Sequence, residues 1–283
     1  MPLSPESLVR NSTVASPPDV YAKLMEVINH PRSGANDVAK VLSSDPGLSS
    51  RLLRIVNSAF FGFPRRVESM SQAVTLVGTG QIRDLALATS VIRAFEGVPD
   101  DMIEMEDFWS YSLATGVVAR LFGARTRADN VERYFLAGVL HSVGRLLLLL
   151  KAPSEAQAAF DRARTENAFL HEAEHDVLGF DHSAVGAALT EAWNLPAAFG
   201  EAVRYQYQPQ RAQNYPNEAA AVHLATVVAT GLEWGSAGES QVLPIQGAAW
   251  DRLGLDAEIL PSLLDDAERQ YQAAVQAVAG ALA

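Results

Sequence analysis

The sequence predicts an all-α protein, a multi-helical bundle with a smaller helical lobe toward its N-terminal end. Apolar residues recur at helical spacing along nearly the whole chain, and no segment alternates apolar and polar residues over the length of a strand. The 283 residues are 48% hydrophobic, which is enough to bury a large core as one big domain or two smaller ones.

In the N-terminal third, capping residues and prolines mark the expected helix starts. Residues 1–17 carry no helical pattern and are expected to form a flexible lead. Asp45 is a predicted N-cap followed by Pro46 in the first turn, and Ser69 is a predicted N-cap for the helix after it. The expected helices here cover residues 20–28, 36–42, 46–56, 72–78 and 81–95.

A boundary that contains Gly and Pro is expected at residues 96–101, and the chain after it is predicted to form a second helical lobe. Residues 235–252 are expected to form a loop because Gly, Ser and Pro gather there, and a last helix follows. The expected helices cover residues 105–123, 130–150, 154–164, 167–178, 182–194, 197–207 and 216–233. The predicted organisation is a lead at 1–17, an N-terminal lobe at 18–98, a second lobe at 99–233, and a loop with a C-terminal helix at 234–283.

Charge and cysteine content exclude several kinds of site. Lys and Arg number 22 against 33 Asp and Glu, a net charge of −11, so nucleic-acid phosphates would on average be repelled. The absence of cysteine excludes disulfides, zinc–thiolate sites and cysteine nucleophiles, and fits a reducing cytoplasm. No stretch has the pattern of a signal peptide or of a clean membrane span, so we expect a cytoplasmic protein without membrane attachment.

Five sequence blocks resemble, in order, the HDOD family, a branch of the HD phosphohydrolase superfamily in bacterial signalling. They are DPGLSSRLLRIVNSAFFG from position 45, SMSQAVTLVGTGQIRDLAL from 69, FWSYSLATG from 108, LAGVLHSVGRLLL from 136 and LGFDHSAVGAALTEAWNLP from 178. The resemblance covers residues 15–230. It implies a multi-helical HD-like bundle preceded by an N-terminal helical lobe.

The resemblance also implies where the metal ligands of an HD hydrolase would fall, and this chain has replaced most of them. Such an enzyme holds one or two divalent metals with a first His, a His-Asp pair and a final Asp. Only one imidazole remains, beside a serine, whereas three protein ligands plus an open position are the usual minimum. The remnant HD positions are Tyr111, His141, Ser142, Gln206, Tyr207 and Thr226.

These replacements predict a degenerate site in a protein that is not an enzyme and that holds neither metal nor cofactor. His141 is then expected to be a core histidine bonded to Tyr111, Ser142 or a backbone carbonyl, because buried polar groups need partners.

A second segment, FLHEAEHDVLGFDH, keeps an alternative open. It contains His171, His175, Asp176 and His182, and the first two share a helix face because they are four residues apart. The favoured interpretation, which the family resemblance implies, is that Glu174 and His182 tie two helices together. Convergence of the four side chains around an ion would instead indicate a metal-dependent phosphohydrolase with an unusual site.

Residues 51–95 carry a local positive charge, with six arginines against Glu68 and Asp84, or 6 − 2 = +4. The favoured interpretation is a solvated face. The alternative is a surface for an anionic small ligand or for the acidic helix of a partner. That candidate ligand or partner surface consists of Arg54, Asn57, Ser58, Arg65 and Arg66. For Asn57, at a helix end, the favoured interpretation is a bond to backbone groups of the adjacent loop, and ligand contact is the alternative.

The predicted function is that of a non-catalytic regulatory or scaffolding protein in bacterial signal transduction. The resemblance implies signalling proteins as partners, with receiver and cyclic-dinucleotide proteins as candidates. A DNA-binding regulator using the helix–turn–helix-like region 69–95 is the second alternative. A homodimer formed through the last helix is also left open.

Overall fold

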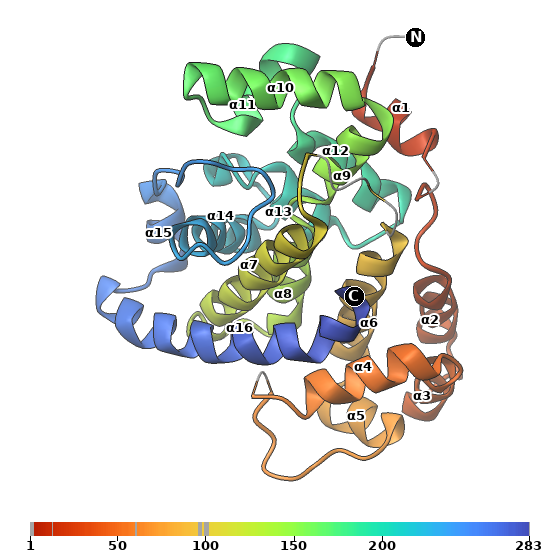
Figure 1. Ribbon diagram of the computed structural model, residues 1–283. Helices are drawn as coiled ribbons and strands as arrows, with labels where there is room; N and C mark the ends of the chain where they lie inside the picture. The colour runs from red at the N-terminus through yellow and green to blue at the C-terminus, as the bar shows by residue number, and fades with distance from the viewer. Residues whose placement is uncertain (1–2, 13, 60, 96–97, 99–101, 283) are drawn as a thin grey trace. The chain divides into compact units, whose positions relative to one another are not determined.

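The computed structural model describes residues 3–12, 14–59, 61–95, 98 and 102–282, and these residues form helices and connecting loops without a strand (Figure 1). The all-α prediction is therefore confirmed. The chain divides into two compact units. Unit 1 comprises Met1–Ser16 and Gly97–Ile259, and unit 2 comprises Pro17–Glu96 and Leu260–Ala283.

Unit 2 is built from the N-terminal helices and the last helix of the chain. The predicted caps are present: the Asp45 side chain accepts from the Leu48 amide at 2.9 Å, and Ser69 accepts from the Gln72 amide at 3.2 Å. The helices are α2 (Asp19–Asn29), α3 (Ala35–Ser43), α4 (Pro46–Val56), α5 (Met70–Val77), α6 (Thr79–Ala94) and α16 (Leu260–Leu282).

Helix α16 contacts α4 and α6 of the same unit. Its buried residues Leu263, Ala267, Tyr271 and Ala274 recur at helical spacing, so they form one apolar stripe. The last helix is thus part of the packing of unit 2.

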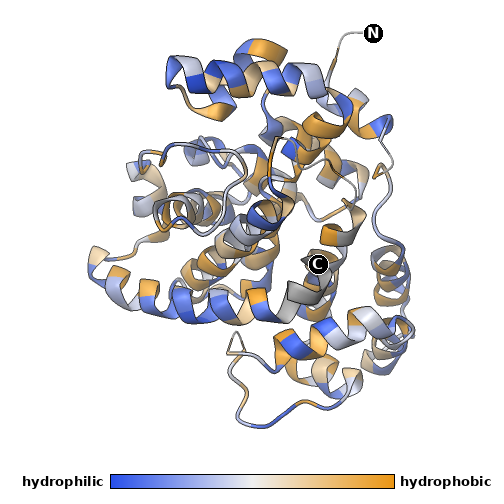
Figure 2. Ribbon diagram, viewed as in Figure 1, coloured by the Kyte–Doolittle hydropathy of each residue, from blue (hydrophilic) through white to orange (hydrophobic). Residues whose placement is uncertain are grey.

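Unit 1 has a core of apolar helices. In Figure 2, α9 is almost wholly hydrophobic, whereas α10 is largely hydrophilic. The helices are α1 (Pro5–Arg10), α7 (Met105–Arg125), α8 (Val131–Leu140), α9 (Val143–Lys151), α10 (Pro153–Glu166), α11 (Leu170–Leu178), α12 (His182–Ala192), α13 (Ala197–Arg204), α14 (Pro216–Gly231) and α15 (Gly247–Leu253). Short 3₁₀ turns lie at Pro209–Arg211 and Ala257–Ile259.

The expected flexible lead at residues 1–17 contains an ordered helix instead. Helix α1 starts with a capping box between Ser4 and Ser7, and it buries Leu8 and Val9. It packs on α12 and α9, and the Trp193 indole donates to the Val14 carbonyl at 2.8 Å. Tertiary contacts with residues far along the chain fix a segment whose local pattern is weak.

The predicted single helix over 130–150 is two helices, α8 and α9, separated at His141 and Ser142. The His141 amide donates to the Gly138 carbonyl at 3.3 Å, a tightened turn that ends α8. The expected loop over 235–252 is also shorter than predicted, because α15 starts at Gly247 and packs on α14.

One segment, Val131–Lys151, is long and apolar enough to cross a membrane by composition. Of its most apolar window, 89% is buried inside the protein. Such burial is characteristic of core helices, and α8 and α9 occupy this segment.

Candidate functional site

His141 lies in the core of unit 1, where α8 gives way to α9, and it is 1% exposed. Its Nδ1 is 2.6 Å from the Gly138 carbonyl oxygen, and its ring stands edge-on to Tyr111 with centroids 5.1 Å apart. Burial lowers the pKa of His141 to about 4, although the bond to Gly138 opposes the shift. The imidazole is therefore neutral at pH 7, and Nδ1 donates to the carbonyl.

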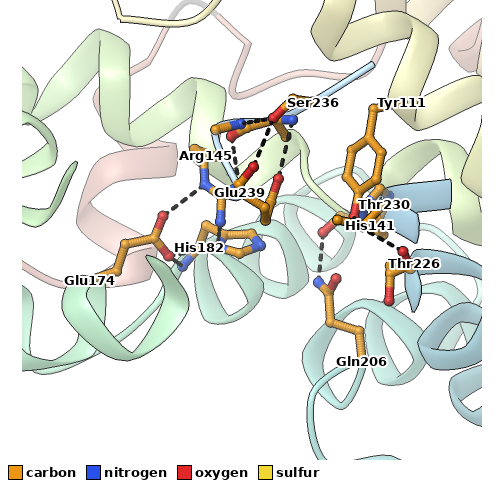
Figure 3. A network of polar contacts seen from close by, with 12 residues as sticks. Tyr111, His141, Arg145, Glu174, His182, Gln206, Thr226, Thr230, Ser236 and Glu239 are labelled. Atoms are coloured by element: carbon orange, nitrogen blue, oxygen red, sulfur yellow. Dashed lines mark hydrogen bonds and ion pairs between the residues drawn. The ribbon is translucent and has the colours of Figure 1, made fainter. Parts of the chain in front are cut away.

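The neighbouring remnant HD positions bond to the protein's own groups. Figure 3 shows Tyr111, Gln206 and Thr226 around His141. The Gln206 amide nitrogen donates to the His141 carbonyl at 2.7 Å, and the Thr226 hydroxyl donates to the His223 carbonyl at 2.7 Å. The Tyr111 hydroxyl lies 3.1 Å from the Thr230 hydroxyl. Tyr111 thus joins α7 to α14, and Gln206, just after α13, holds the break that precedes α9.

The polar atoms left over at this site do not suit a catalytic metal. Three buried side-chain atoms at the remnant HD positions have no hydrogen-bond partner among the described residues: His141 Nε2, Ser142 Oγ and Gln206 Oε1. They belong to one imidazole, one hydroxyl and one amide. None is a carboxylate, which a divalent metal of an HD hydrolase requires for charge neutralisation. The residues present therefore do not fit the metal centre that the resemblance implies at these positions.

Tyr207, the remaining remnant HD position, belongs to a second buried group. Its hydroxyl lies 3.1 Å from His182 Nε2, and its ring stacks on His171 with centroids 3.8 Å apart. Burial lowers the pKa of His171 to about 4, and the nearby His182 adds to the shift. Tyr207 thus connects the histidines of α11 and α12 to a charged cluster beside it.

Arg145 is the centre of this charged cluster and has no exposed surface. Its Nε donates to Glu174 at 2.8 Å, and its Nη1 donates to the Ala237 carbonyl at 2.7 Å and to Glu239 (Figure 3). Burial alone would lower the pKa of Arg145, but the two carboxylates raise it above its usual value. Burial alone would raise the pKa of Glu174 and Glu239, yet Arg145 holds both low. The ions are all charged at pH 7 and compensate one another. We call Arg145, Glu174, His182 and Glu239 the Arg145 cluster.

His182 lies between Arg145 and Glu174, and the two contacts of its Nδ1 fix which ring nitrogen carries the proton. Its Nδ1 lies 2.6 Å from Glu174 Oε2 and 2.8 Å from Arg145 Nη2. A guanidinium can only donate and a carboxylate can only accept, so one nitrogen cannot bond to both. We assign the proton to Nδ1, which donates to Glu174. Glu174 also accepts from the His182 amide at 2.9 Å and so joins α11 to α12, as the sequence predicts.

A close helix crossing places Arg145 beside His182. A Cβ on Gly144 would lie 2.0 Å from the His182 carbonyl oxygen and 2.4 Å from the Gly186 amide nitrogen. Only glycine allows α9 to approach α12 this closely. The next residue, Arg145, then reaches the carboxylate of Glu174 and the imidazole of His182.

The segment 234–246, here called the strap, closes the Arg145 cluster from the other side. Gly235 has φ +80°, and a Cβ there would lie 2.3 Å from the Asp107 carbonyl oxygen. The Ser236 amide donates to the same carbonyl at 3.2 Å. The Gln246 amide donates to His223 Nε2 at 3.0 Å. The strap is therefore held at both ends and supplies Glu239 to Arg145.

The structure does not bring the His171, His175, Asp176 and His182 side chains together around one point. His182 belongs to the Arg145 cluster, His171 stacks on Tyr207, and Asp176 pairs with Arg162 at 2.8 Å. His175 is exposed. Over the described ranges, no group of three or more His, Asp or Glu residues could hold a metal ion.

In unit 2, four of the five residues of the candidate ligand or partner surface line one groove of about 1030 Å³: Arg54, Asn57, Arg65 and Arg66. Asn57 has a structural role there, because its amide donates to the Val67 carbonyl and accepts from the Val67 amide, at 2.8 and 2.7 Å. Ser58 does not line the groove, and its hydroxyl donates to the Ile55 carbonyl at 2.7 Å.

Sequence reasoning missed the importance of Arg145, Glu239 and His223. One signal was present: an arginine within an apolar run must either break the helix pattern or find buried partners. Nothing local points to Glu239, which lies 94 residues from Arg145 along the chain.

Comparison with known proteins identifies the family of this chain. The model of the HDOD domain matches residues 14–209. The chain belongs to the HDOD family. A curated relative, an uncharacterized protein of Treponema pallidum, is 26% identical over 204 residues, which are 70% of this chain and 39% of the relative. The chain thus spans well under half the length of that relative.

Solved structures share the fold of this HDOD protein. An HDOD domain protein from Geobacter sulfurreducens has a TM-score of 0.79 at 21% identity, covering 96% of this chain and 97% of its own. A protein from Shewanella amazonensis with a provisional phosphohydrolase name has a TM-score of 0.72 at 25% identity, covering 99% and 98%. The MmoQ response regulator from Methylococcus capsulatus has a TM-score of 0.50 at 26% identity, covering 90% and 98%. The HDOD domain and such neighbours fit a regulatory role.

Proposed function

We propose that this HDOD protein is a non-catalytic regulatory module that acts by binding a protein or a small ligand in bacterial signal transduction. The observation that carries the proposal is the chemistry of the remnant HD positions. His141 is neutral, bonds to the Gly138 carbonyl and is followed by Ser142 instead of a carboxylate. Such a site supplies neither the ligand charge for a divalent ion nor an activated water.

A metal-dependent phosphohydrolase is the alternative function, and the provisional name of the Shewanella protein supports it. It would need a cage outside the remnant HD positions. His171, Asp176 and His182 have different partners and His175 is exposed, so the four side chains would have to rearrange before they could share an ion. The geometry therefore favours the non-catalytic proposal.

A DNA-binding regulator is the second alternative, and the burial of α6 argues against it. This helix would be the recognition helix of the region 69–95, yet residues 84–92 are buried in succession and α6 packs on α2, α4, α5 and α16 of its own unit. A recognition helix must expose several side chains to base edges in the major groove.

The experiment that tests the proposal is hydrolysis of bis(p-nitrophenyl) phosphate by the full chain with added Mn²⁺. We expect no turnover above that of the buffer and no difference between the wild-type protein and the His141→Ala variant. Turnover that is lost in His141→Ala would overturn the proposal in favour of the remnant HD positions. Turnover that survives this change but is lost in His175→Ala would overturn it in favour of the segment that carries His171, His175, Asp176 and His182.

A further inference from the structure

The groove in unit 2 carries unpaired positive charge in an acidic protein. Arg54, Arg65 and Arg66 are exposed, and none has an ion pair or side-chain hydrogen bond with another described residue. Elsewhere in the same sequence segment, Arg83 is paired with Asp84 at 2.6 Å and Arg51 is buried. Of the groove-lining residues, only Glu68 opposes the three arginines, in a chain with a net charge of −11.

One face of α4 forms the floor of the groove over the whole helix. The lining residues Pro46, Ser49, Ser50, Leu53, Arg54 and Asn57 recur at helical spacing from the first residue of α4 to its C-cap. At 1.5 Å per residue this face is roughly 16 Å long. Leu53 and Arg54 lie side by side in the C-terminal half of this face, where they contribute an apolar surface and a positive charge.

The opposite wall is fixed to α4, so the groove is formed in advance of binding. Asn57 bonds to both backbone groups of Val67, and the Glu68 amide donates to Gln72 at 2.9 Å. Phe63, also in the wall, stacks with Phe61 at a centroid distance of 5.7 Å. A preformed surface loses less conformational entropy when it binds a partner.

We propose that this groove is a docking site for an acidic peptide segment of a partner protein. Guanidinium groups bind carboxylates in a bidentate manner, and Leu53 and Phe63 offer apolar contact between polar positions. The length of the α4 face favours a peptide over a mononucleotide, because roughly 16 Å accommodates about five extended residues. This inference rests on the proposed function and names the class of partner.

The test is fluorescence anisotropy with a labelled peptide of sequence Leu-Glu-Glu-Leu-Glu-Glu-Leu-Glu and the full chain. We expect saturable binding that weakens with added salt, as exposed charge pairs do, and no binding of the same peptide with glutamine in place of glutamate. The double variant Arg65→Glu/Arg66→Glu should weaken binding by about tenfold or more. The matched control is Arg32→Glu, an exposed arginine outside the groove in the same unit, which should change the affinity by less than about twofold.

Three results would overturn the inference: no binding to the wild-type chain, full binding to the double variant, or an equal loss in Arg32→Glu. Displacement of the peptide by ATP at a lower concentration than by unlabelled peptide would assign the groove to a nucleotide instead. Phosphodiester turnover would overturn the proposed function but leave a positive peptide result in place. Failure of peptide binding, together with no phosphodiester turnover, would overturn only the proposal that the groove binds an acidic peptide.

Discussion

The Arg145 cluster of unit 1 and the groove of unit 2 both contain arginine, but they differ in what the arginine faces. Arg145 is buried and contacts two carboxylates and a carbonyl of its own chain. Arg54, Arg65 and Arg66 are exposed and have no such partners among the described residues. A fully compensated buried ion maintains the structure, whereas exposed uncompensated ions are available to a ligand. This difference is the reason for proposing a binding role for the groove of unit 2 and a structural role for the Arg145 cluster of unit 1.

The largest expected effect is the loss of Arg145. Arg145→Met leaves Glu174 and Glu239 buried without their counter-ion, so we expect the free energy of unfolding to fall by about 3–5 kcal/mol. Urea denaturation monitored by circular dichroism measures it. Arg164→Met is the control, because this arginine is 80% exposed and its removal should change stability by about 0.5 kcal/mol or less. A loss below about 1 kcal/mol in Arg145→Met would contradict the structural role of the cluster.

The pH dependence of stability tests the buried histidines of unit 1. The folded-state pKa values of His141 and His171 are about 4, below the ordinary histidine value of 6.5, so the unfolded chain binds more protons between these values. Stability is therefore fully present above pH 6.5 and declines as the pH falls toward 4, by about 1.4 kcal/mol per pH unit for each histidine. Glu174 and Glu239 have lowered pKa values and lose their contribution only below the ordinary glutamate value of 4.5.

The histidine contribution is thus isolated between pH 6.5 and 4.5. Urea unfolding at half-unit steps should show a smaller slope of stability against pH in His141→Asn than in the wild type. His175→Asn is the control, because this histidine is exposed, and it should leave the slope unchanged. Equal slopes in all three proteins would show that His141 is not a buried neutral group.

The helix crossing that sets the Arg145 cluster is tested by Gly144→Ala. The added Cβ overlaps the His182 carbonyl, so α9 and α12 must separate, and we expect a loss of about 3 kcal/mol. The melting temperature followed by calorimetry reports the change. Gly231→Ala is the comparison, since no atom lies within 4 Å of its added Cβ, and there alanine should be neutral or stabilising. Similar melting temperatures for the two variants would contradict the close crossing.

The smallest expected effect on stability comes from substituting the exposed arginines of the groove. Arg65→Ala and Arg66→Ala should each change the free energy of unfolding by about 0.5 kcal/mol or less, because neither side chain has a partner to lose. Urea denaturation against wild type measures it. A loss above about 1.5 kcal/mol would show that these arginines stabilise unit 2 and would remove the contrast with Arg145.

Local signals predicted the parts of the fold that depend on local chemistry. Asp45 and Ser69 cap their helices because a short polar side chain before a helix satisfies free amides wherever the helix packs. The expectation of a flexible segment at residues 1–17 failed for the opposite reason. Helix α1 is held by α12 and α9, which follow more than a hundred residues later. The break at His141 was hidden by a continuous apolar run, since periodicity alone does not show where one buried helix ends and the next begins.

The candidate site was predictable where a residue's own chemistry limited its role. Asn57 bonds to backbone at a helix end, as its side chain favours. The Arg145 cluster was not predictable, because its partners Glu174 and Glu239 become neighbours only through the Gly144 crossing and the strap. Identifying the groove also required the structure, because α4 and the segment at Val67 are joined through the Asn57 side chain.

Calorimetric titration of the metal-free full chain with Mn²⁺ distinguishes a degenerate site from a working metal site. We expect no stoichiometric binding, and the same weak, non-saturating heats in the wild type and in His141→Ala. Saturable binding of one or two ions per chain that disappears in His141→Ala would contradict it, because Ser142 and its neighbours would then hold a working metal site.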